Sequence, residues 1–432
     1  MNGNGGGAVA ILGGVRLPFQ RSGGTYERLI AFDLARAVIA AGLGRMGLDG
    51  DELDGIVMGS VLQNPSTSNV ARDAALAAGV PHSVPANTVT MACISANRAI
   101  ATAALEIRNG SAGLMLAGGV ESLSDIPLSL GKEASRRLAR ARRAKSARDY
   151  LALVQGLTAS DLLPRAPAIA EYSTGETMGE SADRLAAAFG VSREEQDAYA
   201  LRSHQRAAQA TREGRLANEI APYAPPPQFT PVSADNTFRE DSSLEKLARL
   251  PAAFVKPYGT VTAGNSSPLT DGAAVTLLAS SEKARAEGLT PKAVVRDWVF
   301  VAQDPGHELL LGPAYAIPRL LQRWGLAWED IGVFEIHEAF AGQLLAVLAA
   351  LQSERFAREK LGREGAVAPS IDLEKVNPWG GSLSLGHPFG ATGSRLVNTA
   401  VNRLAAQDEQ FAIVSACAAG GLGHAMLLER VQ

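Results

Sequence analysis

The chain has very few cysteines, since Cys93 and Cys417 are the only two among 432 residues. Two thiols so far apart exclude a disulfide framework, and they exclude a structural zinc site, which needs clustered ligands. We therefore expect no resident metal. Unpaired thiols are typical of a reducing compartment, so we expect a cytoplasmic protein.

The chain also has no excess of basic residues, few aromatic residues and no long apolar run. The formal net charge is −3 and aromatic residues make up 5% of the chain, which argues against a general nucleic-acid binder. No apolar run reaches the roughly 18 residues of a membrane span. The glycine-rich start, residues 1–7, lacks the basic segment of a secretory signal and the arginine-rich pattern of a transit peptide.

Short apolar runs alternate with helical stretches through most of the sequence. This alternation predicts parallel-type α/β layers, in a chain long enough for two or three domains. The last two predicted strands are expected to pair antiparallel. The predicted strands are 9–12, 55–59, 89–92, 113–119, 273–278, 293–299, 331–336, 411–415 and 425–429, and the predicted helices are 29–41, 95–108, 314–324, 340–351 and 393–404.

The alternation breaks after Glu121. From about Leu130 to Pro257 the chain is charged, helical and interrupted by prolines, which predicts an excursion inserted into the first α/β unit. The predicted domains are a first α/β half (1–124 and 258–291), an inserted loop domain (125–257) and a second α/β half (292–432). Cys93 and His387 each precede a small-residue helix and a strand, and this repeat predicts pseudo-twofold halves that meet at one site.

Two thiols and two imidazoles stand at strand-to-loop junctions: Cys93, Cys417, His337 and His387. Together they suggest acyl chemistry through a thioester. A helix is predicted directly after Cys93, and its N-terminus is expected to lower the thiol pKa. His387 lies among glycines that allow close approach to a substrate, so it is the better candidate base. The remaining histidines are expected to be structural: His82, His204, His307 and His424.

His337 could polarise a carbonyl oxygen, and the glycine-rich turn after Cys417 offers backbone amides to a developing oxyanion. The thiol of Cys417 can serve first as general acid and then as general base while Cys93 carries the acyl group.

These residues resemble the thiolase family over nearly the whole chain, from Val9 to Glu429. The matching segments are 89–97 (VTMACISAN), 117–122 (AGGVES), 259–267 (GTVTAGNSS), 271–273 (DGA), 337–340 (HEAF), 380–382 (GGS), 386–388 (GHP) and 417–421 (CAAGG). Within the family the chain is most similar to the β subunits of fatty-acid β-oxidation trifunctional complexes. Histidine at 337 in place of the more usual asparagine, the Ala-Ala step after Cys417, and residues 176–185 indicate this subgroup.

The resemblance implies the thiolase fold, with two pseudo-twofold βαβαβαββ halves in an αβαβα core. It implies an acetyl-CoA C-acyltransferase that cleaves 3-ketoacyl-CoA with coenzyme A. In that reaction Cys93 attacks the keto carbon and His387 accepts its proton. Cys417 protonates the acetyl-CoA enolate and then deprotonates coenzyme A. His337 and His387, in part through a water, stabilise the enolate oxygen.

A second oxyanion hole is implied at the backbone amides of Cys93 and Ala419, where many relatives have glycine in place of the alanine. Coenzyme A is implied as a substrate, with no permanently bound cofactor. Its pantetheine arm is expected at Met178, Ser267 and Phe340, and its adenine end near Arg239. Thr177 stands where several relatives have histidine, so no contact is expected from it.

Residues 132–148 carry eight basic side chains, opposed only by Glu133, and an apolar stretch follows. A solvated helix face explains this pattern, but so does contact with an anionic membrane surface or an acidic partner. In the trifunctional complexes the region is similar in position to a segment linked with membrane and partner contact. A hydratase–dehydrogenase α subunit is one such partner, and a homodimer or dimer of dimers is expected from the resemblance.

Three other functions remain open at this stage. A short-chain acetoacetyl-CoA thiolase working towards condensation would use the same residues. A decarboxylating ketosynthase shares the fold, but Cys417 as a second thiol argues against it. A scaffold that only binds coenzyme A or lipid would retain the fold without activity, and the presence of all four reactive side chains argues against that class.

Overall fold

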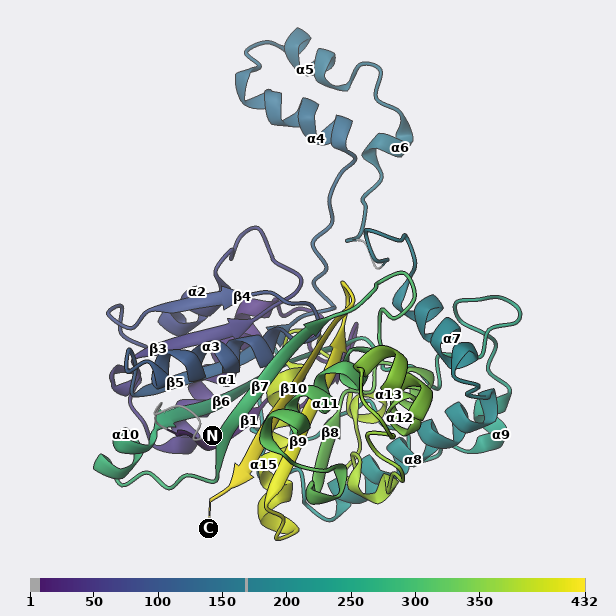
Figure 1. Cartoon of the computed structure of the whole chain (residues 1–432). Helices are drawn as coiled ribbons and strands as arrows, with labels where there is room; N and C mark the ends of the chain where they lie inside the picture. Colours follow the sequence, from purple (N-terminus) through teal and green to yellow (C-terminus); the bar gives the residue numbers. More distant parts are fainter. Residues whose placement is uncertain (1–7, 168–169, 432) are drawn as a thin grey trace.

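The computed structural model describes residues 8–167 and 170–431, so the glycine-rich start lies outside the described residues. The described strands form one continuous sheet in the order β4-β3-β5-β6-β1-β7-β10-β9-β8, and the short β2 pairs with β6 (Figure 1). The strands are β1 (Val9–Arg16), β2 (Gln20–Arg21), β3 (Gly55–Gly59), β4 (Ala86–Val89), β5 (Leu114–Glu121), β6 (Thr270–Ser280), β7 (Ala293–Ala302), β8 (Val333–Ile336), β9 (Phe411–Ala418) and β10 (Leu422–Arg430).

Helices cover both faces of the sheet and fill the long insertion between β5 and β6. Those of the α/β halves are α1 (Ala31–Met46), α2 (Val70–Ala77), α3 (Ser95–Arg108), α10 (Ser281–Ala286), α11 (Gly312–Trp324), α12 (Ala341–Gln352), α13 (Glu354–Leu361), α14 (Ser382–Leu385) and α15 (Thr392–Ala406). Those of the insertion are α4 (Lys132–Ala139), α5 (Ala147–Val154), α6 (Ala159–Leu162), α7 (Met178–Ala188), α8 (Arg193–Arg212) and α9 (Leu244–Ala248).

The sheet is mixed, which corrects the expectation of parallel layers. Strands β3, β4 and β5 pair in parallel, as do β8 and β9. The strands between them, β6, β1, β7 and β10, pair antiparallel with their neighbours. The final hairpin of β9 and β10 is antiparallel, as predicted. A long insertion leads from β5 to β6, and it lets the chain re-enter the sheet in the opposite direction.

The two halves repeat one strand order, read outward from the junction of β1 and β7. The first half continues through β6, β5, β3 and β4, and the second through β10, β9 and β8. Where β4 pairs with β3, the second half has only an isolated bridge between Phe334 and Val376. The expected βαβαβαββ pattern is therefore incomplete in the second half, because this segment is too short to form a full strand.

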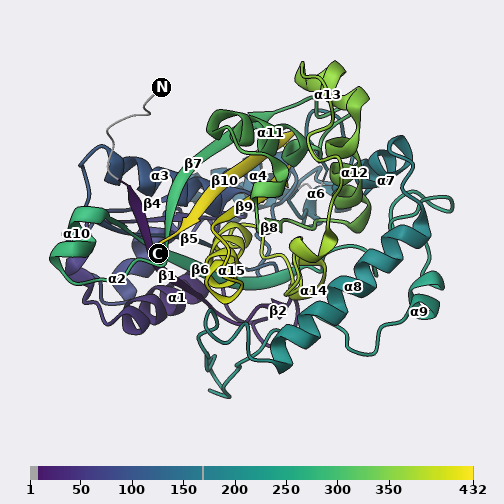
Figure 2. The ribbon, with the colours of Figure 1, turned by 60° about the horizontal axis from the view of Figure 1, so that its bottom comes forward.

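Helices lie on the outer side of each half of the sheet and between the two halves, in agreement with the expected αβαβα arrangement, and Figure 2 shows helices on both sides of the sheet. Helices α1 and α2 pack on the first half of the sheet, and α11 packs on the second half. Helices α3 and α15 pack against each other and against strands of both halves. Three separate apolar clusters fill the spaces between layers, and the middle one contains the alanine-rich face of α3 and the leucine and valine face of α15. This middle layer positions the starts of α3 and α15 side by side.

Most predicted elements agree with the structure, and one strand does not. Helix α3 and strand β3 have the predicted bounds, whereas the strand predicted at 89–92 is wrong, because β4 ends at Val89. The next residues turn instead, and Ala92 has φ 46°. A non-glycine residue in the left-handed region is strained, and such strain is found at functional sites.

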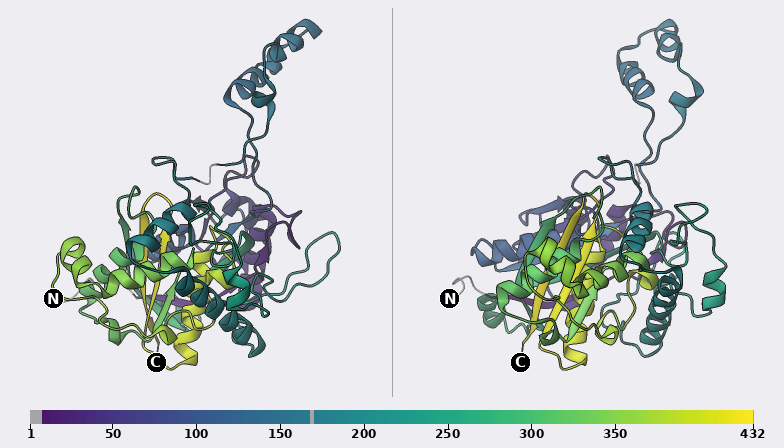
Figure 3. Two further views of the ribbon diagram at one scale, coloured as in Figure 1. Left: turned by 90° about the vertical axis from the view of Figure 1, so that its right-hand side faces the viewer. Right: turned by 45° about the vertical axis from the view of Figure 1, so that its right-hand side comes forward.

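The insertion divides into two parts. Helices α7 and α8 pack against α12, and α8 also packs against α14, so this part belongs to the body of the second half. Residues 126–167, which we call the arm, stand away from the rest of the molecule (Figure 3). The two segments that lead into the arm pair at its base through Ser129 and Arg165. No helix within the described residues is both long and apolar enough to cross a membrane.

Candidate active site

Cys93 lies between the strained Ala92 and the start of α3. Ile94 caps that helix, and the Ser95 hydroxyl fixes the turn by accepting from the Met91 N–H and donating to the Ala92 carbonyl. As a whole residue Cys93 is half-buried, whereas Cys417 is buried. The turn therefore presents the Cys93 sulfur to the space in front of α15.

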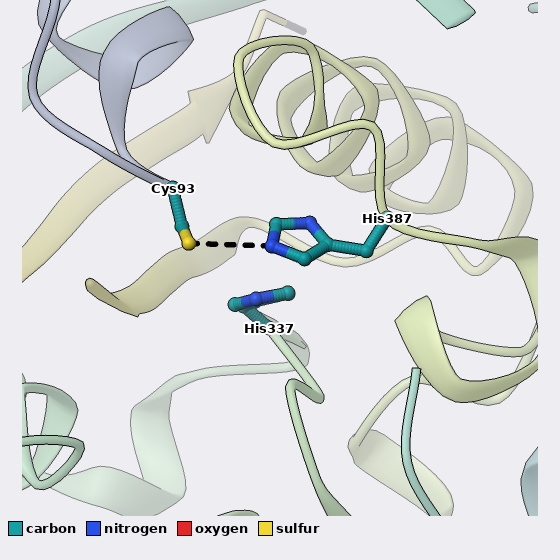
Figure 4. Close-up of side chains that lie close together, drawn as sticks. All are labelled: Cys93, His337 and His387. Atoms are coloured by element: carbon teal, nitrogen blue, oxygen red, sulfur yellow. Dashed lines mark hydrogen bonds between the residues drawn. The ribbon is translucent and has the colours of Figure 1, made fainter. Parts of the chain in front are cut away.

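His387 meets this sulfur from the other half of the sheet (Figure 4). Its Nε2 lies 3.3 Å from Cys93 Sγ, and its Nδ1 lies 2.6 Å from the hydroxyl of Thr392 on α15. The residue before it, Gly386, has φ 96°, and a Cβ there would lie 2.6 Å from Thr270 Oγ1. Only glycine fits this turn, and the turn places the imidazole in front of the thiol.

His337 lies directly after β8, and its ring centroid is 4.1 Å from that of His387. Its backbone N–H donates to the Ser415 carbonyl, which extends the pairing of β8 with β9. Nδ1 lies 2.8 Å from the Ser382 hydroxyl, while the buried Nε2 has no hydrogen-bond partner among the described residues. An unpaired buried nitrogen beside a reactive thiol is available to a substrate atom.

The expected lowering of the Cys93 pKa is wrong for the resting site. Burial, with a smaller contribution from the charge of Glu121, raises the pKa of the thiol to about 12. The backbone amides of Ala419 and Cys93 lower this pKa, but by less than burial raises it. Desolvation outweighs the helix terminus because an apolar surrounding strongly disfavours the thiolate. The thiol is therefore protonated at rest and needs a base.

Both active-site histidines are neutral at rest. Burial lowers the pKa of His387 to about 3, and the Arg395 guanidinium contributes. Burial lowers the pKa of His337 well below its usual range, with the neighbouring His387 and Arg395 adding to the effect. A neutral imidazole can accept a proton, so His387 retains the form that a general base requires.

Cys417 lies near the end of β9, and burial raises the pKa of its thiol, with the neighbouring Cys93 adding to the effect. Ala419, two residues further on, brings its backbone amide close enough to the Cys93 thiol to lower the pKa of that thiol. The next amide, Gly420 N–H, donates instead to the Glu171 carboxylate at 2.7 Å. The oxyanion hole predicted at the amides of Cys93 and Ala419 stays a prediction, and the Gly420 amide is engaged elsewhere.

Three of the four expected coenzyme A contacts gather beside Cys417. Met178 and Phe340 belong to one apolar cluster with that thiol. The N–H of Ser267 donates to the carbonyl of Ala339, the residue before Phe340. Arg239 does not join this group, since it is exposed and its backbone N–H donates to His204 on α8.

Two buried carboxylates support the site and were missed in the sequence. Glu338 accepts from Tyr199 Oη (2.8 Å), Ser203 Oγ (2.9 Å), Asn377 Nδ2 (2.7 Å) and the Leu383 N–H (3.2 Å). Glu121 accepts from the N–H groups of Val61, Leu62 and Gly390, each at 3.0 Å. Both glutamates stand inside the motifs that carry the family resemblance, and this was the only sign of their role.

The four histidines expected to be structural lie outside this group. His424 is buried and its Nδ1 hydrogen-bonds to the Val299 carbonyl, while His204 is buried on α8. His307 is exposed beside Asp304, and His82 is exposed at the surface.

Cys93, His337 and His387 also bring three potential metal-ligand atoms within 4.8 Å of one another. Such a set could hold a metal only if both imidazoles turned a lone pair towards it. A thiol with a base, a second thiol and a second imidazole are suited to acyl transfer.

Comparisons with known proteins agree with this geometry. The family described as "Thiolase, N-terminal domain" matches residues 9–282, and "Thiolase, C-terminal domain" matches residues 289–430. The two matches meet shortly before the boundary predicted at 291–292.

Among curated proteins, the chain is 51% identical over 421 residues to the mitochondrial trifunctional enzyme subunit beta of Bos taurus. The match covers 98% of this chain and 88% of that protein. It is 47% identical to a probable 3-ketoacyl-CoA thiolase of Caenorhabditis elegans, with 98% and 94% covered. Among solved structures, a Bacillus anthracis acetyl-CoA acetyltransferase matches with a TM-score of 0.85 and 33% identity, covering 99% of this chain and all of that one.

Proposed function

The chain belongs to the thiolase family and has its fold, and from this premise we propose that it is a 3-ketoacyl-CoA thiolase of fatty-acid β-oxidation. It cleaves a 3-ketoacyl-CoA with coenzyme A to give acetyl-CoA and a shortened acyl-CoA. The observation that carries this proposal is the hydrogen bond between Cys93 and His387 with Cys417 beside them.

The first half of the reaction forms an acyl-enzyme. The sulfur of Cys93 attacks the keto carbon while its proton passes to His387 Nε2. The oxyanion that develops lies against the N–H groups of Cys93 and Ala419. The bond between C2 and C3 then breaks, and His337 and His387 stabilise the thioester oxygen of the departing enolate.

The second half returns every proton to its starting group. The thiol of Cys417 protonates the enolate carbon to give acetyl-CoA, and the resulting Cys417 thiolate deprotonates incoming coenzyme A. The coenzyme A thiolate then attacks the acyl group on Cys93. The Cys93 thiolate leaves and recovers its proton from His387, so the cycle closes with all four groups as they began.

Coenzyme A is a substrate in this cycle, and no resident cofactor is needed. Met178, Ser267 and Phe340 support this reading because they gather beside Cys417. Arg239 stays a prediction as an adenine contact. Assembly as a homodimer or dimer of dimers and a cytoplasmic location also stay predictions, although the vertebrate relatives carry "mitochondrial" in their names.

We also propose that the arm makes a peripheral contact with a membrane. Its residues carry nine basic and three acidic side chains in a chain whose net charge is −3. It also exposes large apolar side chains that the body of the protein does not cover: Leu138, Tyr150, Leu151, Val154, Leu162 and Leu163. Basic charge beside exposed leucines fits an anionic lipid surface. An acidic partner, such as the α subunit of a trifunctional complex, is the competing occupant.

The test of the main proposal is coenzyme A-dependent cleavage of 3-ketoacyl-CoA substrates from about four to sixteen carbons, by wild type and Cys93→Ala. Activity that rises with chain length and is lost in the variant supports β-oxidation. Activity confined to acetoacetyl-CoA supports the short-chain thiolase instead. Retained substrate binding with no cleavage by the wild type would support the binding scaffold.

A further inference from the structure

The two active-site histidines rest on different hydroxyl groups. His387 Nδ1 is bonded to Thr392, and His337 Nδ1 is bonded to Ser382. Both imidazoles are neutral, so each carries a single N–H at either Nδ1 or Nε2. The bonds that each hydroxyl makes on its other side decide between these two forms.

Thr392 fixes the form of His387. Its Oγ1 donates to the Pro388 carbonyl at 3.3 Å, and a carbonyl oxygen can only accept. The hydroxyl hydrogen is therefore engaged there, and Thr392 accepts from His387 Nδ1–H. His387 Nε2 is left with a lone pair that faces the Cys93 thiol, as a general base requires.

Ser382 fixes the opposite form of His337. Its Oγ accepts from Arg395 Nη2 at 2.9 Å, and a guanidinium can only donate. The hydroxyl hydrogen then has one acceptor among the described residues, namely His337 Nδ1. The proton of His337 must sit on Nε2, the nitrogen without a partner. The other form would leave both the buried Ser382 hydroxyl hydrogen and the Nε2 lone pair unsatisfied.

Arg395 is itself fixed within the middle layer. It is fully buried on α15, and its Nη1 lies 3.4 Å from the carboxylate of Glu335, two residues before His337. The positive charge beside Ser382 therefore cannot leave the site without breaking a buried ion pair, which is costly. Ser382 begins α14, and His387 follows two residues after the end of that helix. One short segment therefore supplies both His387 and the hydroxyl partner of His337.

We propose that Ser382 and Thr392 are positioning residues that hold His337 and His387 in opposite tautomers, one as hydrogen-bond donor and the other as base. This inference rests on the proposed function for its catalytic meaning. Ser382 serves the enolate oxygen through His337 Nε2–H, and Thr392 serves the activation of Cys93 through His387 Nε2. The two hydroxyl groups therefore act on different steps.

The direct test is the ¹⁵N spectrum of ring-labelled histidine in the full-length protein at rest, with assignments from His337→Asn and His387→Asn. We expect His337 protonated at Nε2 and His387 protonated at Nδ1. In Ser382→Ala the His337 signals should move towards a mixture of tautomers, with His387 unchanged. A wild-type His337 protonated at Nδ1 would overturn the proposal. This readout needs no substrate, so it stands even if the proposed reaction fails.

Kinetics separate the two positioning residues. Ser382→Ala should lower kcat for carbon–carbon cleavage roughly 10- to 100-fold and leave alkylation of Cys93 by iodoacetamide unchanged. Thr392→Val should slow that alkylation. Ser394→Ala removes another buried α15 hydroxyl, which bonds to Thr276 and not to a histidine, and serves as the matched control. In a His337→Asn background, Ser382→Ala should change kcat less than about twofold. Equal losses in both backgrounds would show a merely structural role and overturn the assignment.

Discussion

The sulfur of Cys93 lies 3.3 Å from Nε2 of His387, a residue that belongs to the other half of the sheet. Because burial raises the thiol pKa to about 12 and lowers the imidazole pKa to about 3, the resting pair is neutral. Charges develop only during the attack on a substrate: His387 becomes an imidazolium, and the carbonyl oxygen of the substrate takes up the negative charge.

Replacing His387 with asparagine should remove the base while retaining a polar side chain. Cleavage of 3-ketoacyl-CoA should fall about 10²- to 10⁴-fold, the usual contribution of a positioned base. Alkylation of Cys93 at neutral pH should slow at least about tenfold, because the thiol loses its proton acceptor. Stopped-flow cleavage and mass-spectrometric labelling measure both. Unchanged alkylation would assign the activation of Cys93 to another group.

Replacing Cys417 with alanine should separate proton transfer at the acetyl-CoA carbon from the attack on the thioester. Exchange of the acetyl-CoA methyl hydrogens with deuterium should fall at least about 100-fold, because Cys417 moves that proton. Acylation of Cys93 by acetyl-CoA should remain measurable. Cys93→Ala provides the reverse control, since it cannot be acylated. Exchange at the wild-type rate in the Cys417 variant would rule out this thiol as the acid and base.

Charge reversal in the arm should abolish binding to anionic vesicles. The double change Arg140→Glu and Arg143→Glu should weaken sedimentation with phosphatidylglycerol vesicles at least about tenfold, because each basic side chain near such a surface contributes about 1 kcal/mol. Arg355→Glu with Arg358→Glu makes the same charge change on α13, away from the arm, and should bind as wild type does. If the arm variant sediments with vesicles as well as wild type does, the arm does not bind the membrane, and an acidic protein partner becomes the better candidate for this surface.

The buried His424 should make the fold sensitive to acid. Burial lowers its pKa to about 3 in the folded state, against about 6.5 when unfolded. Between these values the unfolded chain binds a proton that the folded chain does not. The free energy of unfolding therefore falls as pH falls below about 6.5, by up to about 1.4 kcal/mol per pH unit from this residue.

His424→Gln tests this contribution by urea unfolding at several values between about pH 7 and 4.5. The variant should be less stable at pH 7, because it disturbs the contact with Phe300 and the bond to Val299. The gap to wild type should narrow by roughly 2 kcal/mol at the acid end. If the free energy of unfolding of the variant and that of wild type fall in parallel as pH falls, His424 is not the source of the acid sensitivity.

The sequence predicted the fold class, and it singled out the four reactive side chains. Small-residue patterns and apolar runs are local properties, and α3 with β3 followed them residue for residue. Residues 89–92 did not, because β-branched side chains favour a strand there while the Ser95 hydroxyl, bonded to Met91 and Ala92, holds a turn. Mixed pairing in the sheet was missed for a similar reason, since strand direction depends on neighbours far away in the chain.

The hydroxyl partners of the histidines could not be predicted at all. Ser382 lies 45 positions from His337, and no spacing rule connects two such residues. The pKa of Cys93 was expected in the wrong direction because a sequence shows a following helix but not how much of the thiol is desolvated. The helices of the arm were expected. Their projection from the body was not, because a sequence does not show that a helical segment makes few contacts with the rest of the molecule.

The pairing of β1 with β7 bears on the order in which the active site is assembled during synthesis on the ribosome. Cys93 is synthesised 294 residues before His387, and the strand that joins the two halves, β1, is the first to be made. Throughout most of translation the thiol has neither its base nor the Ala419 amide beside it. A growing chain therefore lacks the arrangement that would catalyse acyl transfer until His387 and Ala419 have been made.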